Sequence, residues 1–129
     1  MTEPAATIVV VDDDASVRRG LERLLRAVGY LVETYESAAQ FLARAPIAGP
    51  CCLVLDVRMP GQGGLELYQT LTAGGRHLPV VFITGLGDIP TVVRAMRAGA
   101  VDFLTKPFDD KELLDAVDQA LSGKRRSSQ

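Results

Sequence analysis

The sequence has few of the residues on which small disulfide-bonded or zinc-binding domains depend. Its 129 residues include only two cysteines, Cys51 and Cys52, and one histidine, His77. Adjacent cysteines cannot build a disulfide framework or supply spaced zinc ligands, and His77 has no second imidazole beside it. We interpret the cysteines as small core residues rather than a reactive thiol pair, and His77 as a loop residue.

A secretory signal, a long apolar run and an excess of one charge are also missing. Residues 1–4 lack the basic start of a signal peptide, and no apolar run approaches the length that spans a bilayer. The formal net charge is −2, with basic residues scattered among acidic ones. We therefore expect a cytoplasmic location, no membrane association and no direct nucleic acid binding by this segment.

The composition is that of one ordinary globular domain. Hydrophobic residues make up 47% of the chain and charged residues 23%, which excludes a disordered or fibrous class. The length suits a single core. We expect one domain over residues 1–122, followed at residues 123–129 by a polar, basic tail or the start of a linker.

Short apolar runs predict buried strands at residues 7–11, 51–55, 79–83 and 101–104, with a weaker candidate at 30–35. The runs are continuous rather than alternating, which is typical of parallel strands covered on both faces. Helical spacing occurs between them. The predicted helices are one before Gly29, a short one over residues 37–44, two ending near Gly74 and Gly99, and a last one capped by Asp110. In the first of these, Arg18 is predicted to face outward. The alternation predicts an α/β fold with a five-stranded parallel sheet between helices.

Chemically informative residues stand at the ends of these runs. Ligands of an open parallel sheet bind beyond the carboxyl ends of its strands. The run at 7–11 is followed by Asp12, Asp13 and Asp14, and the run at 51–55 by Asp56. The run at 79–83 is followed by Thr84, and Lys106 comes just after the run at 101–104. We expect carboxylates, a hydroxyl and an ammonium group to meet at one edge of the sheet.

Such a set suits phosphoryl transfer. Carboxylates a few ångströms apart repel by roughly 4 kcal/mol per pair at an effective dielectric near 20, so a cation such as Mg²⁺ is expected among them. An aspartate beside Mg²⁺ can accept a phosphoryl group. Thr84 offers a hydrogen-bond donor and Lys106 a positive charge to the phosphoryl oxygens.

Each residue also has a purely structural interpretation. Asp14 fits an N-cap of the first helix, Asp56 an ordinary loop acid and Thr84 an ordinary strand-end hydroxyl. Lys106 alone would be a solvated lysine, although the following proline indicates a fixed turn that could contain a cis peptide bond. The inference depends on the joint placement of these residues.

From Ile8 to about Ser122 the chain resembles the receiver domain of two-component response regulators. The matching segments, in the order found in that family, are residues 9–13, 55–61, 64–67, 83–85 and 98–108. The resemblance implies a doubly wound flavodoxin-like sandwich with strand order 2-1-3-4-5. It further implies that a sensor histidine kinase phosphorylates Asp56, with Thr84 and Lys106 around the phosphoryl group. The implied Mg²⁺ ligands are Asp12, Asp13, Asp56 and the backbone carbonyl of Arg58.

The resemblance also implies an output mechanism. Phe103 matches the family's switch aromatic, whose rotamer is coupled to Thr84. Phosphorylation is then expected to favour a homodimer through the fourth helix and fifth strand. We place Val93, Arg97 and Asp102 in that interface, with Arg97 of one chain meeting Asp102 of the other; the alternative is that Val93 is core and Arg97 solvated.

Residues 59–61, 83–90 and 95–103 are similar to the FixJ and NarL-type branch, whose members usually carry a DNA-binding domain after the receiver. The segment is therefore expected to be either an excised receiver that controls transcription or a natural single-domain regulator. Leu86 is apolar where the family often has a polar residue, which leaves the dephosphorylation rate open.

Two rival functions remain. Residues 12–14 also fit the nucleophile motif of haloacid dehalogenase phosphatases, but this leaves Asp56 unexplained and gives no room for a substrate cap. The second rival is a receiver-shaped interaction module that is never phosphorylated. We expect a signalling domain that catalyses only its own phosphorylation and dephosphorylation.

Overall fold

Strands and helices alternate along the chain in the computed structural model, which describes residues 5–59, 61–85, 89–97 and 102–122. The strands are β1 Thr7–Val11, β2 Leu31–Tyr35, β3 Cys51–Asp56, β4 Val80–Thr84 and β5 Asp102–Thr105. The helices are α1 Ala15–Ala27, α2 Ala38–Leu42, α3 Gly64–Ala73, α4 Ile89–Arg97 and α5 Asp110–Leu121. All the predicted elements are present, and where an end lies within the described residues it differs from the prediction by at most two positions.

The strands form one parallel sheet in the order β2-β1-β3-β4-β5. β1 lies between β2 and β3, so Thr7 is in register with both Leu31 and Cys51. The chain thus winds outward from β1 in one direction and then from β3 in the other. This confirms the doubly wound architecture and the strand order, and it brings the carboxyl ends of all five strands to one edge.

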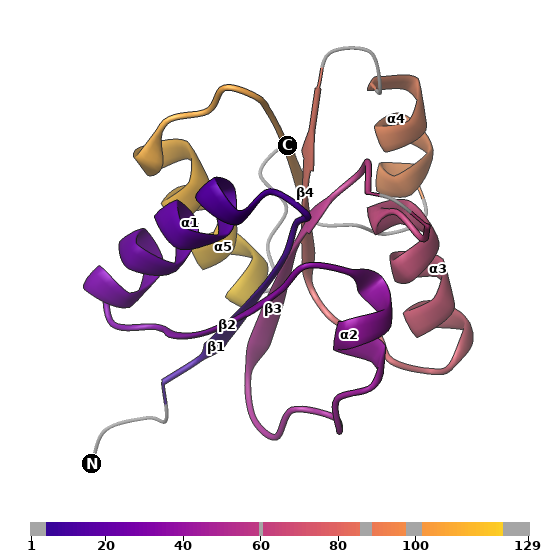
Figure 1. The fold of residues 1–129 in the computed structure, drawn as a ribbon, viewed down its shortest axis with the longest axis horizontal. Coiled ribbons are helices and arrows are strands. Elements are labelled where there is room, and N and C mark those ends of the chain that lie inside the picture. Colours follow the sequence, from indigo (N-terminus) through magenta and orange to yellow (C-terminus); the bar gives the residue numbers. More distant parts are fainter. Residues whose placement is uncertain (1–4, 60, 86–88, 98–101, 123–129) are drawn as a thin grey trace.

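Helices cover both faces of the sheet: α1 and α5 one face, and α2, α3 and α4 the other (Figure 1). Successive residues of β1 alternate between the layers, Val9 packing toward α2 and α3 and Ile8 toward α1 and α5. Both residues are fully buried. The continuous apolar runs in the sequence follow from this arrangement, since each central strand has two buried faces.

Side-chain caps fix the starts of α1 and α5. Asp14 accepts hydrogen bonds from the amides of Ser16 and Val17, which confirms its predicted capping of α1. Asp110 was the wrong choice for α5: Asp109 is the N-cap and accepts the Glu112 amide, while Asp110 is the first helical residue. Both aspartates are suitable N-cap residues, but only Asp109 has a glutamate three positions later, and its extended backbone and reciprocal hydrogen bonds with Glu112 identify it as the cap.

Several predicted features lie outside the described residues. These are Leu86, the end of the fourth helix at Gly99, the first residue of the run at 101–104, and the tail at residues 123–129. Within the described ranges, no helix has the length and apolar character needed to cross a membrane.

Candidate functional site

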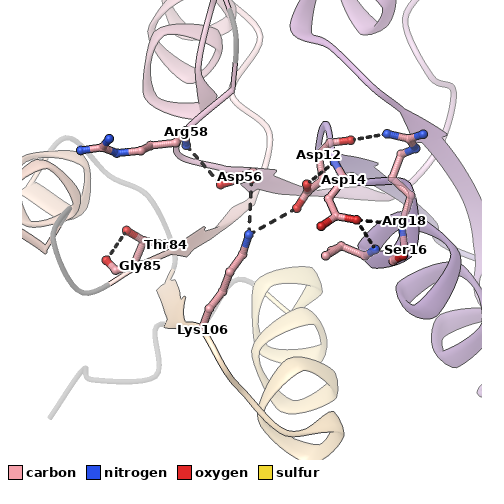
Figure 2. Close-up of polar contacts among 10 residues, drawn as sticks. Asp12, Asp14, Ser16, Arg18, Asp56, Arg58, Thr84, Gly85 and Lys106 are labelled. Atoms are coloured by element: carbon pink, nitrogen blue, oxygen red, sulfur yellow. Dashed lines mark hydrogen bonds and ion pairs between the residues drawn. The ribbon is translucent and has the colours of Figure 1, made fainter.

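The carboxyl edge of the sheet brings together four of the residues chosen from the sequence. Asp12 follows β1 directly, Asp56 is the last residue of β3, and Lys106 follows β5. Figure 2 shows the Lys106 side chain reaching toward both aspartates, with the β1–α1 turn on one side and β3 on the other. Asp13 belongs to the same turn as Asp12, so strands far apart in sequence supply one polar cluster.

Three carboxylates form the acidic part of this cluster. Oxygen atoms of Asp12, Asp13 and Asp56 lie within 4.8 Å of one another. Asp12 and Asp56 are buried, with 1% and 7% of their surface exposed, whereas Asp13 is exposed. Backbone amides orient the two buried groups: Asp14 N–H donates to Asp12 Oδ1 at 2.9 Å, and Arg58 N–H donates to Asp56 Oδ1 at 3.1 Å.

Lys106 supplies the positive charge opposite these acids. Its Nζ lies 3.5 Å from Asp56 Oδ2 and 3.8 Å from Asp12 Oδ2. The peptide bond between Lys106 and Pro107 is cis, as the sequence suggested. One lysine beside two of the three carboxylates leaves the cluster with a net negative charge.

The pKa of Asp12 shows that this charge is poorly balanced. Burial raises the pKa of Asp12 from 3.8 to about 6, and the charges of Asp56 and Asp13 also raise this pKa. The Asp14 amide and Lys106 act in the opposite direction without cancelling the rise. Within the described residues, Asp12 Oδ2 is buried and accepts no hydrogen bond. A hard divalent cation with oxygen ligands fits this donor set, because it would offset the repulsion and bind the oxygen that accepts no hydrogen bond.

Arg18 is a site residue that the sequence analysis misplaced. It was predicted to lie on the outward face of the first helix, but its side chain is only 18% exposed. Its Nη1 donates to the backbone carbonyl of Asp12 at 2.7 Å (Figure 2). Arg18 therefore holds the β1–α1 turn that carries the acidic residues. Helical spacing gave no signal of this, because an arginine at the border of an apolar stripe can extend either way.

Thr84 and Phe103, the predicted switch pair, lie on neighbouring strands. Thr84 is the last residue of β4 and is 1% exposed. Its hydroxyl donates to the Gly85 carbonyl at 3.0 Å, and no hydrogen bond to Asp56 is found in the described part of the chain (Figure 2). Phe103 on β5 is in register with Phe82 and packs, partly buried, against the α2–α4 side of the core.

The residues predicted to form a dimer interface differ in exposure. Val93 is 40% exposed and Arg97 is exposed, so both lie on the surface of α4. Asp102 is only 8% exposed, and its Oδ1 accepts the amide of Phe103. The α4 residues are accessible to a second chain as they stand, whereas the Asp102 carboxylate is largely covered.

An open pocket of about 490 Å³ borders the acidic cluster. It is lined by Asp13, by the residues after β3 and by the start of α3, namely Val57, Arg58, Met59, Gly61, Gly63 and Glu66. A small molecule therefore has room beside the end of β3. The sequence analysis included Glu66 in a matching segment but gave it no role, and it did not identify Gly63, because the contacts of both residues depend on how α3 is placed against β3.

The remaining reactive side chains lie elsewhere. Cys51 and Cys52 are buried free thiols, and burial raises the pKa of both. His77 is exposed in the loop before β4. The interpretations of these residues as core and loop are confirmed.

Comparison with known proteins gives one consistent result. A family model described as response regulator receiver domain matches residues 8–118. Nodulation protein W of Bradyrhizobium diazoefficiens is 51% identical over 126 residues, covering 96% of this chain and 56% of the relative. The response regulator StyR superimposes with a TM-score of 0.86 at 52% identity, covering 94% of this chain and 61% of that one. FixJ-N gives a TM-score of 0.85 at 41% identity, covering 93% and 96% of the two chains. The chain spans about half the length of the curated relatives it matches.

Proposed function

The chain belongs to the response regulator receiver domain family, in the FixJ and NarL-type branch, and on this premise we propose that Asp56 accepts a phosphoryl group from a sensor histidine kinase. The haloacid dehalogenase alternative is not favoured, because the family match extends over residues 8–118 and the acidic cluster includes Asp56. The proposed role is that of a signalling domain that catalyses only its own phosphorylation and dephosphorylation, in the cytoplasm.

One observation carries this proposal. The Asp56 carboxylate stands at the end of β3 with Oδ1 held by the Arg58 amide and Oδ2 facing Lys106 Nζ at 3.5 Å. The carboxylate directly precedes Val57 and Arg58, which line the open pocket, and a cation is placed where the oxygens of an incoming phosphoryl group would need one. Attack by an Asp56 oxygen forms an aspartyl phosphate and breaks the bond between phosphorus and the donor imidazole, which keeps the electron pair and takes up a proton.

Mg²⁺ is the cofactor that the donor set suits. Asp12, Asp13, Asp56 and the Arg58 carbonyl would hold it, and the buried Asp12 oxygen that accepts no hydrogen bond supports this assignment. When bound, Mg²⁺ offsets carboxylate repulsion and the negative charge of the phosphoryl oxygens. Lys106 contributes a second positive charge, and Thr84 would turn its hydroxyl from Gly85 toward the phosphoryl group.

Mass spectrometry after incubation with acetyl phosphate and Mg²⁺ tests the acceptor. The parent should gain one acid-labile phosphoryl group, and Asp56→Asn should gain none. Asp115→Asn is a matched control, since Asp115 is an exposed aspartate on α5 and should leave the modification unchanged. Equal phosphorylation of Asp56→Asn would disprove the assignment. An unmodified parent would favour an interaction module that is never phosphorylated.

For the output, we infer a homodimer through α4 and β5 that forms on phosphorylation. The added negative charge would draw Thr84 and Lys106 inward, and Phe103 could then turn into the space behind Thr84. Val93 and Arg97 already lie on the surface of α4, so they would make the first contacts. Asp102 would have to become more accessible before it could pair with Arg97 of the second chain.

Sedimentation with and without beryllofluoride, a phosphoryl mimic, tests this interface. The parent should dimerise when the mimic is bound, and Val93→Glu should remain monomeric. Val28→Glu provides a control, because Val28 is an exposed valine at the end of α1, far in sequence from α4. Dimerisation of Val93→Glu at the parent's affinity would rule out the α4 surface.

The longer relatives suggest where the signal goes. Those named FixJ are transcriptional regulatory proteins, of which this chain covers about half. We propose that a receiver over residues 1–122 controls transcription through a DNA-binding domain, with residues 123–129 as a tail or the start of a linker, and that the receiver itself does not bind nucleic acid. A natural single-domain regulator remains the alternative, and the reading frame beyond Gln129 distinguishes the two.

A further inference from the structure

The first turn of α3 rests directly on the backbone that carries Asp56. The Gly64 amide donates to the Val57 carbonyl at 3.2 Å, and the Val57 amide donates to the Ile83 carbonyl of β4 at 2.9 Å. The peptide units after Asp56 are therefore held from two sides, by α3 and by β4. Since Arg58 N–H in turn orients Asp56 Oδ1, movement of this backbone would rotate or shift the carboxylate.

Two consecutive glycines make this close approach possible. A Cβ atom on Gly64 would lie 2.5 Å from the Asp56 carbonyl oxygen, 3.0 Å from its carbon and 3.2 Å from Leu55 Cβ. A Cβ atom on Gly63 would lie 2.4 Å from the Val57 carbonyl oxygen. The obstructing atoms are mainly backbone atoms of β3 and the turn after it, which cannot rotate away as a flexible side chain would.

Space, and not backbone conformation, is what these positions require. Gly63 has a φ of −81°, which any residue can adopt, and neither Gly63 nor Gly64 is among the glycines with positive φ. By contrast, Gly20 in α1 has open space around the place of a Cβ atom, because a Cβ added to it would meet nothing within 4 Å. A methyl group is therefore tolerated on one helical glycine of this domain and excluded on another.

We propose that Gly63 and Gly64 are positioning residues for the phospho-acceptor, because their lack of side chains lets α3 fix the backbone of Asp56 and Val57. The inference rests on the proposed function of Asp56. A Cβ atom on Gly64 would lie 2.5 Å from the Asp56 carbonyl oxygen, whereas ordinary contact begins at 3.4 Å. The two atoms would therefore have to move apart by about 0.9 Å. Displacements near 1 Å can slow a reaction by about a hundredfold, so Gly64→Ala should slow phosphorylation by about ten- to a hundredfold.

Gly64→Ala and Gly63→Ala should be compared with Gly20→Ala in three measurements. The first is the initial rate of phosphorylation by acetyl phosphate with Mg²⁺, at a temperature where melting curves show each variant fully folded. The second is the melting temperature itself. The third is the amide resonance of Arg58 in the nuclear magnetic resonance spectrum without donor or metal, which reports the hydrogen bond to Asp56 Oδ1. The Gly64 variant should shift this resonance and lose rate, and Gly20→Ala should do neither.

Glu66→Ala provides a milder perturbation if the glycine variants do not fold. Glu66 is exposed and its Oε1 accepts the Gly63 amide at 3.1 Å, so its removal loosens the start of α3 without adding bulk. Glu112→Ala is its matched control, because Glu112 makes the same contact with Asp109 at the start of α5. The Glu66 variant should move the Arg58 resonance and lower the rate about two- to threefold, and the Glu112 variant should do neither.

The outcomes distinguish a failure of this inference from a failure of the proposed phosphorylation of Asp56. A parent that is not phosphorylated refutes the proposed function, while the Arg58 resonance still tests whether α3 positions Asp56. A folded Gly64→Ala variant with the parent's rate and an unmoved Arg58 resonance overturns the inference. The same holds if Glu66→Ala leaves both unchanged, or if Gly20→Ala reduces the rate as strongly as Gly64→Ala.

Discussion

Replacing Lys106 with methionine tests the electrostatic description of the site most directly. The substitution keeps a long side chain and removes the charge that faces Asp56 Oδ2 at 3.5 Å and Asp12 Oδ2 at 3.8 Å. At an effective dielectric near 20, each attraction is roughly 4 to 5 kcal/mol. The Lys106 side chain is 38% exposed, so water screens both interactions, and the net contribution is about 1 kcal/mol per pair.

Two opposite effects should follow from this substitution. Without metal, the variant should melt about 5 °C below the parent, because a loss of about 1 to 2 kcal/mol shifts the melting temperature of a domain this size by several degrees. With the lysine gone, the carboxylates should bind Mg²⁺ about tenfold more tightly, which corresponds to about 1.4 kcal/mol. Saturating Mg²⁺ should therefore raise the melting temperature of Lys106→Met more than that of the parent.

Circular dichroism melting curves in EDTA and across a Mg²⁺ titration measure both effects. Lys111→Met is the control: Lys111 pairs with Asp115 at 2.7 Å, but their side chains are 83% and 51% exposed, so neither stability nor the Mg²⁺ response should change. The reasoning is refuted if Lys106→Met melts like the parent in EDTA, or if its response to Mg²⁺ is no greater than the parent's.

Three further predictions concern titration and burial. Because the pKa of Asp12 is raised to about 6, protons should compete with Mg²⁺, and a Mg²⁺ titration should show weaker binding at pH 5 than at pH 7; equal affinity would contradict the buried site. The Arg44 guanidinium holds the pKa of Glu33 below 4.5, so its stabilisation is complete above pH 4.5 and is lost as the pH falls through the lowered folded-state value. The melting-temperature gap between the parent and Arg44→Met should therefore be present at pH 7 and shrink by pH 3, and a constant gap would argue against the pair. Cys51 and Cys52 should resist iodoacetamide until the domain unfolds, as measured by mass spectrometry, and rapid labelling of the native chain would show that they are accessible.

The fold was predictable because its signals are local and repeated. Continuous apolar runs such as residues 51–55 indicate strands with two covered faces, and the 3.6-residue spacing of Leu21 and Leu25 indicates a helix packed on one side. The ends of the elements were less certain, as the choice between Asp109 and Asp110 shows. Strand order came from the family resemblance, since apolar patterns alone do not say which strands are neighbours.

The sequence by itself determined the chemical inventory of the site. Asp12, Asp13, Asp56 and Lys106 each follow or end an apolar run, and parallel strands necessarily deliver such residues to one edge. Their meeting within hydrogen-bonding or ion-pair range could therefore be expected from residue type and position alone.

Only the tertiary structure decided how these groups are held. Arg18 reaches back to the Asp12 carbonyl, the Thr84 hydroxyl is turned to Gly85, and the Asp102 carboxylate is covered. Gly63 and Gly64 leave room for α3 against the backbone of β3. These features depend on distances between elements that are remote in sequence and on the direction each side chain takes. A linear pattern specifies which face a residue occupies, but it does not specify how closely two packed elements approach each other.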